Sequence, residues 1–218
     1  MSTGRIGSLT DGVFAIVMTL LVFDLRLPQE IERVAAGLEQ IGTEFIVFII
    51  SFVILGQYWV SHHSQVDLIR RADQIVLWSN IAYLLGVSLV PSTSRLLGRF
   101  RGELLPVVIY TINLSFISVC HYIIWRYSTE YISEKARRYV PNELDSDFVK
   151  EGYRMTLVPI AFYVAAVPLA EIDFSLSLLA YALVPVYVIY RMAQFNRRHQ
   201  ELVEQAEEEQ ESVIEVTD

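Results

Sequence analysis

The first side chain that could do chemistry is Asp11, which interrupts an apolar segment at residues 5–27. An ionisable group near the centre of a membrane span costs roughly 2.5–3.5 kcal/mol on insertion scales, so such a group needs a partner or a function. Because Asp11 follows the polar residues Ser8 and Thr10, we expect a network that fixes the helix, or an ion or proton relay. The expected partner is Arg5 of a neighbouring copy or a histidine of another helix. The alternative is an interfacial acid that only reaches water.

Two adjacent histidines, His62 and His63, end the second apolar segment, and Asp67 follows. His63 and Asp67 are four residues apart and could share a metal ion, whereas neighbouring histidines point about 100° apart on a helix. A metal site usually needs three or more protein ligands, and the sequence offers no second cluster of ligand types. We therefore predict no metal site and expect histidines that hydrogen-bond to neighbouring helices. A metal-dependent intramembrane enzyme is the weaker alternative.

The first apolar segment also carries a stripe of small and bulky residues at helical spacing. Residues three, four and seven apart share one face of a helix, and Asp11 points away from that face. Bulky aliphatic side chains repeated around a ring would form apolar collars that gate by dewetting, and a hydroxyl between them could coordinate an ion. By periodicity alone, ordinary packing or lipid contact is the better explanation of the stripe. Its members are Gly12, Ile16, Thr19, Leu20 and Phe23.

Nothing in the sequence predicts an enzyme. The chain has no GxSxG elbow, no HExxH pair and no glycine-rich phosphate loop, and it lacks a TVGYG-like run that could form a carbonyl filter. Cys120 is the single cysteine, which excludes an intrachain disulfide and a thiolate metal cluster. The net charge of −8 argues against a nucleic-acid partner. No cofactor is expected.

These residues must be positioned by membrane-spanning helices. Of the 218 residues, 53% are hydrophobic, the mean hydropathy is +0.39, and the apolar residues come in blocks long enough to cross a bilayer. The sequence predicts an all-α, six-span integral membrane protein. The first span carries acids and is expected to be retained rather than cleaved as a signal peptide. The predicted spans are Ile6–Leu27, Ile41–His63, Ile75–Leu97, Leu104–Trp125, Tyr153–Leu169 and Phe174–Arg191.

Two polar segments complete the predicted organisation. Residues 126–152 mix charges, and we expect a solvated connector with a short amphipathic helix rather than a ligand-binding module. Residues 1–192 form the membrane domain and residues 193–218 an acidic tail. From His199 to Asp218 the tail has eight acids and no Lys or Arg, which favours a solvated segment.

Loop charge predicts the orientation. With the N-terminus inside, twelve of the 17 lysines and arginines fall in inside segments and five fall outside. An excess of positive charge marks the cytoplasmic side, so both termini are expected to be cytoplasmic in a cell (inner) membrane. Arg95, Arg99 and Arg101 form a discordant cluster on the outer side.

Residues 5–11, RIGSLTD, resemble the RxxxFSD signature of the lysosomal-type transmembrane potassium channels and their bacterial homologues. Arg5 and Asp11 match the signature, while Leu9 and Thr10 stand where it has Phe and Ser. The runs YWVSHH at 58–63 and DQIVLWSNIAYLLGVSLVPS at 73–92 resemble the second and third spans of that family. The resemblance covers about the first half of the chain.

The resemblance implies a potassium-permeable channel without a backbone filter, assembled in bacteria as a tetramer of six-span subunits. The first span would line the pore, with Ile16 as the narrowest collar and Thr19, Leu20 and Phe23 as later pore positions. Phe23 is bulkier than the leucine expected there. A supporting shell would hold the pore helix by hydrogen bonds; it consists of Trp59, His62, His63 and Asn80.

The functional hypothesis is therefore a homotetrameric, weakly selective cation channel that prefers potassium among monovalent cations. A proton-coupled transporter that uses Asp11 and His62 is the alternative. The two differ in kinetics, because a channel gives single-channel current steps and a transporter gives saturable flux driven by pH.

Overall fold

The computed structural model is a bundle of long helices, and it describes residues 3–23, 25, 34–68, 74–136 and 146–194. Six helices in these ranges are long and apolar enough to cross a membrane, and no strand occurs among the described residues. The predicted all-α, six-span fold class is confirmed. The helices are α1 (Thr3–Phe23), α2 (Val34–Leu68), α3 (Gln74–Arg99), α4 (Leu104–Ala136), α5 (Ser146–Ile172) and a final helix, Phe174–Gln194.

The helix boundaries differ from the predicted spans in one consistent way. α2, α4 and α5 continue well beyond their apolar stretches, because main-chain hydrogen bonding sustains a helix after its side chains turn polar. The short amphipathic helix expected within residues 126–152 is a continuation of α4 as far as Ala136. The first span was predicted too long, since α1 ends at Phe23 and the N–H of Leu25 donates to the carbonyl of Val22 in a tight turn.

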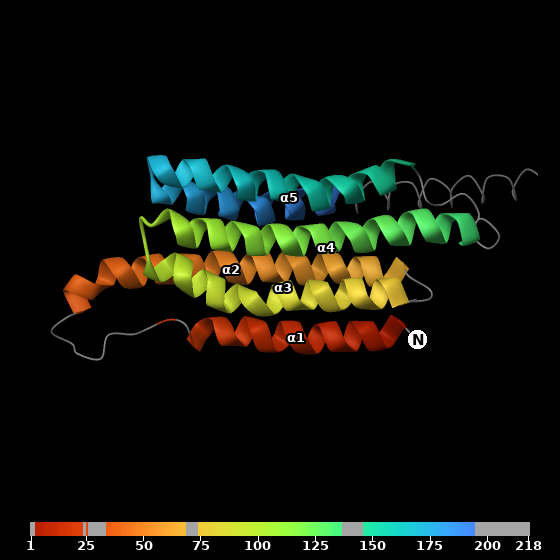
Figure 1. Cartoon of the computed structure of the whole chain (residues 1–218), viewed down its shortest axis with the longest axis horizontal. Helices are drawn as coiled ribbons and strands as arrows, with labels where there is room; N and C mark the ends of the chain where they lie inside the picture. Colours follow the sequence, from red (N-terminus) through yellow and green to blue (C-terminus); the bar gives the residue numbers. More distant parts are fainter. Residues whose placement is uncertain (1–2, 24, 26–33, 69–73, 137–145, 195–218) are drawn as a thin grey trace, which may run out of the picture.

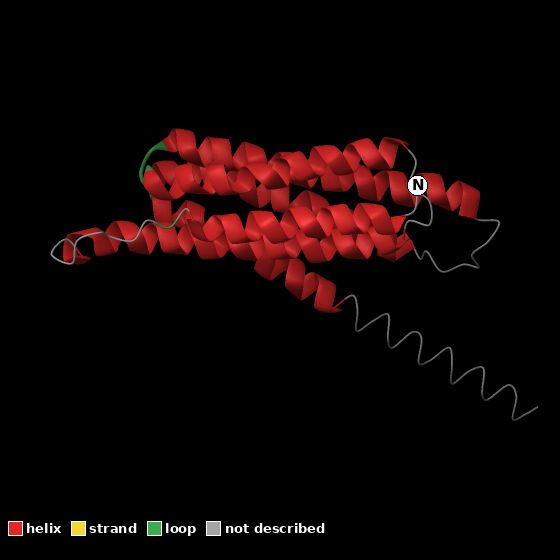
Figure 2. Ribbon diagram, turned by 90° about the horizontal axis from the view of Figure 1, so that it is seen from below, coloured by secondary structure: helices red, strands yellow, loops and turns green. Residues whose placement is uncertain are grey.

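The helices lie side by side along one axis, with α1 on one flank of the bundle (Figures 1 and 2). α1 packs against α2 and α3, and α3 packs against α4, which in turn packs against α5. The final helix lies beside α5 on the flank farthest from α1 (Figure 1). α1 is therefore a peripheral helix with one face on the bundle and one face outside it.

Two very short turns connect neighbouring helices. Between α3 and α4 the chain reverses at Gly102, whose φ of 87° lies in the left-handed region that favours glycine. Between α5 and the final helix only Asp173 is non-helical. Its carboxylate accepts the N–H of Ser175 at 2.7 Å, which caps the start of the final helix.

Hydrogen-bonding and small residues hold the bundle together, as membrane helices require where the lipid is as apolar as the side chains. The hydroxyl of Tyr58 lies 2.6 Å from the Oγ of Ser118 and 3.2 Å from the hydroxyl of Tyr163, which ties α2 to α4 and α5. The amide of Asn113 donates to the carbonyl of Gly86 at 2.9 Å, which ties α4 to α3. The buried core thus contains hydrogen-bonded polar side chains at its centre in addition to apolar ones.

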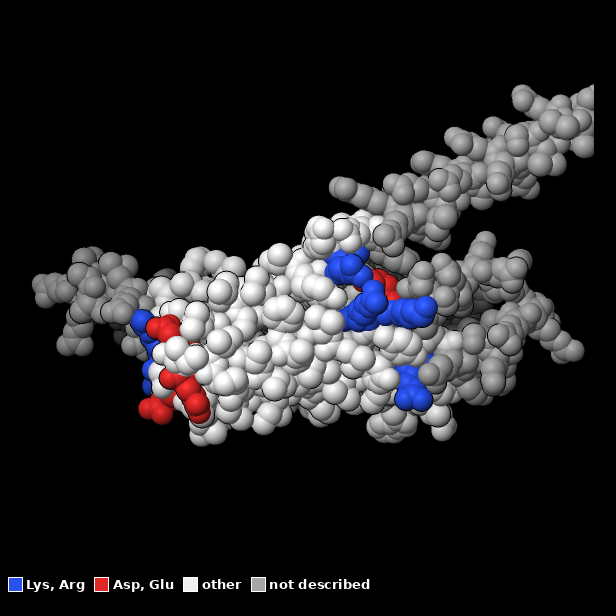
Figure 3. Space-filling model, turned by 90° about the horizontal axis from the view of Figure 1, so that it is seen from above, with Lys and Arg blue, Asp and Glu red and all other residues white. Residues whose placement is uncertain are grey.

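The charged residues are distributed as a membrane protein requires. In the face shown in Figure 3, Lys, Arg, Asp and Glu gather toward the two ends of the bundle and leave a broad uncharged band between them. The band has the character of a lipid-facing surface. Residues 195–218, which form nearly all of the predicted acidic tail, and residues 137–145 of the connector lie outside the described residues.

Candidate pore-lining face and its polar anchor

α1 has two faces of different character. One face is buried against α2 and α3, and its members repeat at helical spacing. The opposite face is exposed in the single chain and carries the predicted stripe, in which Ile16 is 62% and Phe23 76% exposed. The two faces separate because residues three and four apart share a side of the helix. The buried face consists of Ile6, Thr10, Phe14, Val17 and Leu21.

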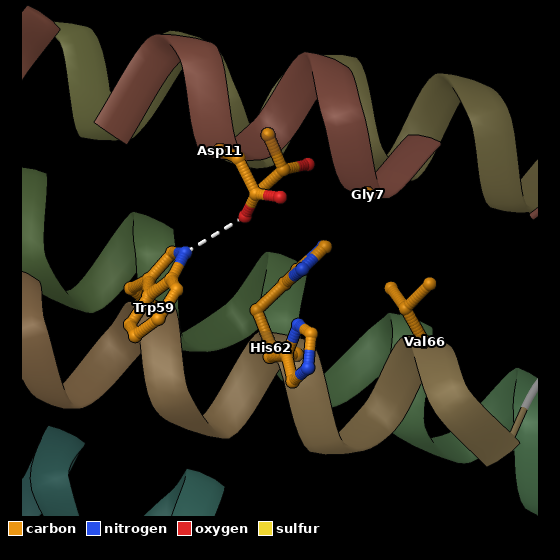
Figure 4. Close-up of a pocket in the computed structure, with 7 residues that line it drawn as sticks. Gly7, Asp11, Trp59, His62 and Val66 are labelled. Carbon is orange, nitrogen blue, oxygen red and sulfur yellow. Dashed lines mark hydrogen bonds between the residues drawn. The ribbon is translucent and has the colours of Figure 1, made fainter. Parts of the chain in front are cut away.

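Asp11 lies at the edge between these faces and is held by α2. Its Oδ1 accepts a hydrogen bond of 2.8 Å from the indole Nε1–H of Trp59 (Figure 4). The indole in turn stacks on the imidazole of His63, with ring centroids 5.9 Å apart. Asp11 therefore pairs with Trp59 within this chain and not with a histidine of another helix. The other expected partner, Arg5 of a neighbouring copy, stays a prediction.

Thr10 is held by α3. Its hydroxyl lies 3.4 Å from the Nδ2 of Asn80, and the Oδ1 of Asn80 lies 2.7 Å from the Nε2 of His62. Because a carbonyl oxygen only accepts, Nε2 of His62 must carry the proton in this contact. The imidazole of His62 stacks on the ring of Tyr83 at 4.9 Å. One amide thus joins three helices at a single level of the bundle.

The structure brings together six of the predicted signature and supporting residues and leaves two apart. Thr10 and Asp11 meet α2 and α3, whereas Arg5 and Leu9 lie on the exposed side of α1. A small pocket lies between α1 and α2 at the level of Asp11 (Figure 4). It is lined by Gly7, Thr10, Asp11, Trp59, His62, His63 and Val66. We name the contacts among Thr10, Asp11, Trp59, His62 and Asn80 the polar anchor of α1.

The predicted stripe contains one polar side chain. The hydroxyl of Thr19 donates to the carbonyl of Ile16 at 2.7 Å, so its oxygen lone pairs remain available on the exposed face. Leu20 is 45% exposed on the same side. The stripe therefore presents bulky apolar groups with a single hydroxyl among them.

Sequence reasoning missed one aromatic residue that supports the anchor. Tyr83 is fully buried between His62 and Phe14, and its ring centroid lies 6.0 Å from that of Phe14. Tyr83 follows Asn80 by three residues and therefore shares its face of α3. That spacing was the available signal.

No group of three or more His, Cys, Asp or Glu side chains among the described residues is placed to hold a metal ion. The side chain of Asp67, one of the two weighed ligands, lies outside what the structure describes. The geometry at this level is that of a helix anchor built from neutral amides, aromatic rings and one carboxylate.

Comparison with known families gives a match over the anchor-bearing part of the chain. Residues 5–91 match the family model described as endosomal/lysosomal potassium channel TMEM175. This range contains α1, α2 and most of α3, and with them every residue of the polar anchor.

Curated relatives match over a somewhat longer part. A potassium channel of Chryseobacterium sp. is 31% identical over 57% of this chain and 64% of its own length. A potassium channel of Chamaesiphon minutus is 34% identical over 45% of this chain and 50% of its own. The endosomal/lysosomal proton channel TMEM175 of Rattus norvegicus is 30% identical over 57% of this chain and 28% of its own. The matches thus span less than two thirds of each relative.

The fold also has a solved counterpart. A crystal structure described as a lysosomal potassium-selective channel TMEM175 homolog from Chamaesiphon minutus superposes with a TM-score of 0.72. The superposition covers 87% of this chain and 97% of that chain, at 24% sequence identity. The shared architecture therefore includes the helices beyond residue 91, where the family model does not reach.

Proposed function

We propose that this chain, whose residues 5–91 match the TMEM175 family model, is a channel of that kind: a potassium-permeable, weakly selective cation channel whose pore is lined by α1. Relatives named potassium channels support the permeant ion. The observation that carries the proposal is the two-faced packing of α1. One face is fixed by the polar anchor, and the other leaves an apolar stripe without cover from the described part of its own chain.

A pore lined by one helix per subunit needs several subunits. We propose a homotetramer in which the exposed stripes of four copies of α1 surround a common axis. A head-to-tail contact between identical subunits forms either a closed ring or an open filament, and a ring of four copies is the closed form proposed here. The stripe residues Ile16, Leu20 and Phe23 then form successive collars, and Thr19 supplies a hydroxyl layer between them.

Selectivity in such a pore comes from dehydration. An apolar collar offers an ion no replacement for its water shell, so the ion that holds water less tightly crosses more easily. Potassium holds its shell less tightly than sodium. The collar at Ile16 therefore favours potassium. The preference is weak, because the collar has no ring of carbonyl oxygens that could coordinate potassium in place of its water shell.

The proposed location is a cell membrane with both termini cytoplasmic. Six spans return the chain to the side from which it started, and the loop charges favour that side as the inside. The partners are lipid, further copies of the chain and monovalent cations. The proposal includes no enzymatic activity and no cofactor.

The first prediction tests the collar. Purified full-length chain in planar bilayers, under opposing potassium and sodium gradients, should give current steps and a reversal potential that favours potassium. Ile16→Asn should shift the reversal potential toward sodium, because an amide lets a partly hydrated ion pass. Val22→Asn is the matched control, since Val22 is also exposed on α1 but lies beside the stripe. An unchanged ion preference in Ile16→Asn would contradict the proposal.

A proton-coupled transporter is the second candidate function. Asp11 and His62 line the same pocket, which is the observation that favours it. The mammalian relatives named proton channels agree with a proton as one transported ion. The same bilayer experiment decides between the two: saturable, pH-driven flux without current steps would favour the transporter.

A further inference from the structure

Three polar side chains form a row on the buried face of α2, away from the polar anchor. Gln57, Ser61 and Gln65 are spaced four residues apart, and each is more than nine-tenths buried. The Oε1 atoms of both glutamines and the Oγ of Ser61 have no hydrogen-bond partner among the described residues. Two further such atoms among the described residues belong to α4: Nε2 of His121 and Oγ of Ser115. We name Gln57, Ser61, Gln65 and His121 the polar row.

The polar row is a compact feature rather than a scatter of isolated atoms. The imidazole of His121 hydrogen-bonds to the main chain of Ser61, which places the two helices in contact at this level. Gln57 and Gln65 lie one turn to either side of Ser61 on the same face of α2. The hydroxyl cluster of Tyr58 and Ser118 lies close by in the bundle centre.

The hydroxyl of Ser61 differs from those of two other helical serines, Ser64 and Ser88. Ser64 and Ser88 turn back and donate to the carbonyl four residues earlier, at 3.1 and 2.8 Å. This back-bonding is how a hydroxyl satisfies itself in a dry helical environment. Ser61 makes no such bond to any described residue. Its hydroxyl is therefore left for a partner outside the described residues.

Buried polar atoms without partners cost free energy, and a cluster of them indicates a ligand. The ligand must donate hydrogen bonds, because the Oε1 atoms of Gln57 and Gln65 and the free Nε2 of a neutral His121 accept, and it can also accept one from the hydroxyl of Ser61. The four side chains are neutral or weakly basic and spread along two helical turns. That arrangement does not suit a single metal ion, which needs its ligands around one point.

The spacing of the row fits water. Residues four apart on a helix are separated by about 6 Å along the axis. One water that hydrogen-bonds to two oxygens spans about 4.5–5 Å, because each bond is about 2.8 Å long and the two meet near the tetrahedral angle. The glutamine side chains are long enough to close the remaining difference, so one water can bridge Gln65 and Ser61 and another can bridge Ser61 and Gln57. Each has the two or more polar partners that a buried water requires.

We propose that each subunit binds a single file of ordered water molecules between α2 and α4, held by Gln57, Ser61, Gln65 and His121. The file runs from Gln65 inward to the hydroxyl cluster of Tyr58, Ser118 and Tyr163. It lies inside the subunit and is separate from the proposed pore along α1. The inference does not depend on the pore being where we propose it.

The direct test is an experimental structure of the full chain in lipid nanodiscs, at a resolution that shows ordered water. Water density should lie within hydrogen-bond distance of the Oγ of Ser61, the Oε1 of Gln65 and the Nε2 of His121. Direct bonds from these atoms to other protein groups, or a dry contact, would overturn the proposal.

A second test uses the sign of a stability change. If water satisfies the row, Ser61→Ala and Gln65→Met each remove a water partner and should lower the melting temperature by about 2–4 °C. If the oxygens are dry, the same substitutions remove buried unpaired groups and should raise it. Ser64→Ala is the matched control, because Ser64 is exposed on the same helix and should leave the melting temperature unchanged. An unchanged or raised melting temperature in both row variants counts against bound water.

Discussion

Asp11 is an acid near the start of a membrane helix, and its partner is a tryptophan rather than a base. An indole N–H donates a hydrogen bond without bringing a second charge into the membrane. Hydrogen bonds between membrane helices contribute about 0.6 kcal/mol on average and at most about 1.7 kcal/mol. The bond therefore orients α1 more than it stabilises the fold.

Trp59→Phe keeps the ring and removes the donor. We expect it to lower the free energy of unfolding by about 0.6–1.7 kcal/mol, and to show coupling of that size with Asp11→Asn in a double-mutant cycle. Unfolding in bicelles measures both quantities. Trp78→Phe on α3 is the control, because Trp78 is 69% exposed. Additive effects of the two anchor substitutions would show that the 2.8 Å contact carries no energy.

At the scale of the helices, the contact between α3 and α4 depends on a glycine. A Cβ atom added at Gly86 would lie 2.7 Å from the Cγ1 of Ile117 and 3.0 Å from a ring carbon of Phe116. The same glycine accepts the amide of Asn113, so the two helices cannot separate without breaking that hydrogen bond. Gly86 thus sets the distance between α3 and α4.

Gly86→Ala should destabilise the chain by about 1–3 kcal/mol, the usual range for an overpacked core. Thermal unfolding in detergent measures the effect. Gly56→Ala is the control, since its Cβ would meet only the Cε of Met18 at an ordinary 3.9 Å. Equal melting temperatures for the two variants would show that the α3–α4 contact adjusts freely.

The one-residue connection between α5 and the final helix predicts a pH dependence. The bond from the Ser175 N–H to the carboxylate lowers the pKa of Asp173 below its ordinary value of 3.8. Since the folded pKa is depressed, the cap stabilises fully above the ordinary pKa and is lost as the pH falls through the folded one. The melting temperatures of wild type and Asp173→Ala should therefore differ constantly above about pH 5 and converge below pH 4. Asp173→Asn should keep the cap and lose the pH dependence; a gap that persists at low pH contradicts the assignment.

At the scale of the whole molecule, the proposed assembly places four copies of α1 around one axis. In a Cys120→Ser background, Leu20→Cys should then form disulfide-linked dimers on mild oxidation, because equivalent residues face each other across the pore. Val186→Cys is the control, since Val186 is 62% exposed on the final helix, on the flank farthest from α1. Native mass spectrometry should report four subunits. Cross-linking at Val186 with none at Leu20 would place α1 against lipid.

The sequence predicted the six spans because the free energy of transferring a helix into lipid is a sum over about twenty neighbouring residues. It did not predict where α2 and α4 end. The helical turns beyond each apolar stretch have polar side chains, and whether they stay helical depends on contacts with residues far away in the sequence. Periodicity placed Ile16 and Phe23 on one face of α1 and Asp11 off it. That this face lines a pore is still a prediction.

The sequence predicted less well which residues of the polar anchor contact one another. Resemblance indicated Trp59, His62 and Asn80 as supports, but the pairing of Asp11 with Trp59 depends on how α1 sits against α2. The role of Tyr83 depends on which face of α3 is buried. Both are set by the crossing of three helices, and no local pattern encodes such a crossing.

The polar anchor has a consequence for biosynthesis. Its members are far apart in the chain: Trp59 follows Asp11 by 48 residues, and Asn80 follows Thr10 by 70. At roughly 5–20 residues per second, the ribosome needs about 4–14 s after Thr10 to make Asn80. During that interval α1 lacks the partners that Trp59 and Asn80 supply in the finished fold. We therefore expect the contacts that orient α1 to be complete only after the third helix has been made.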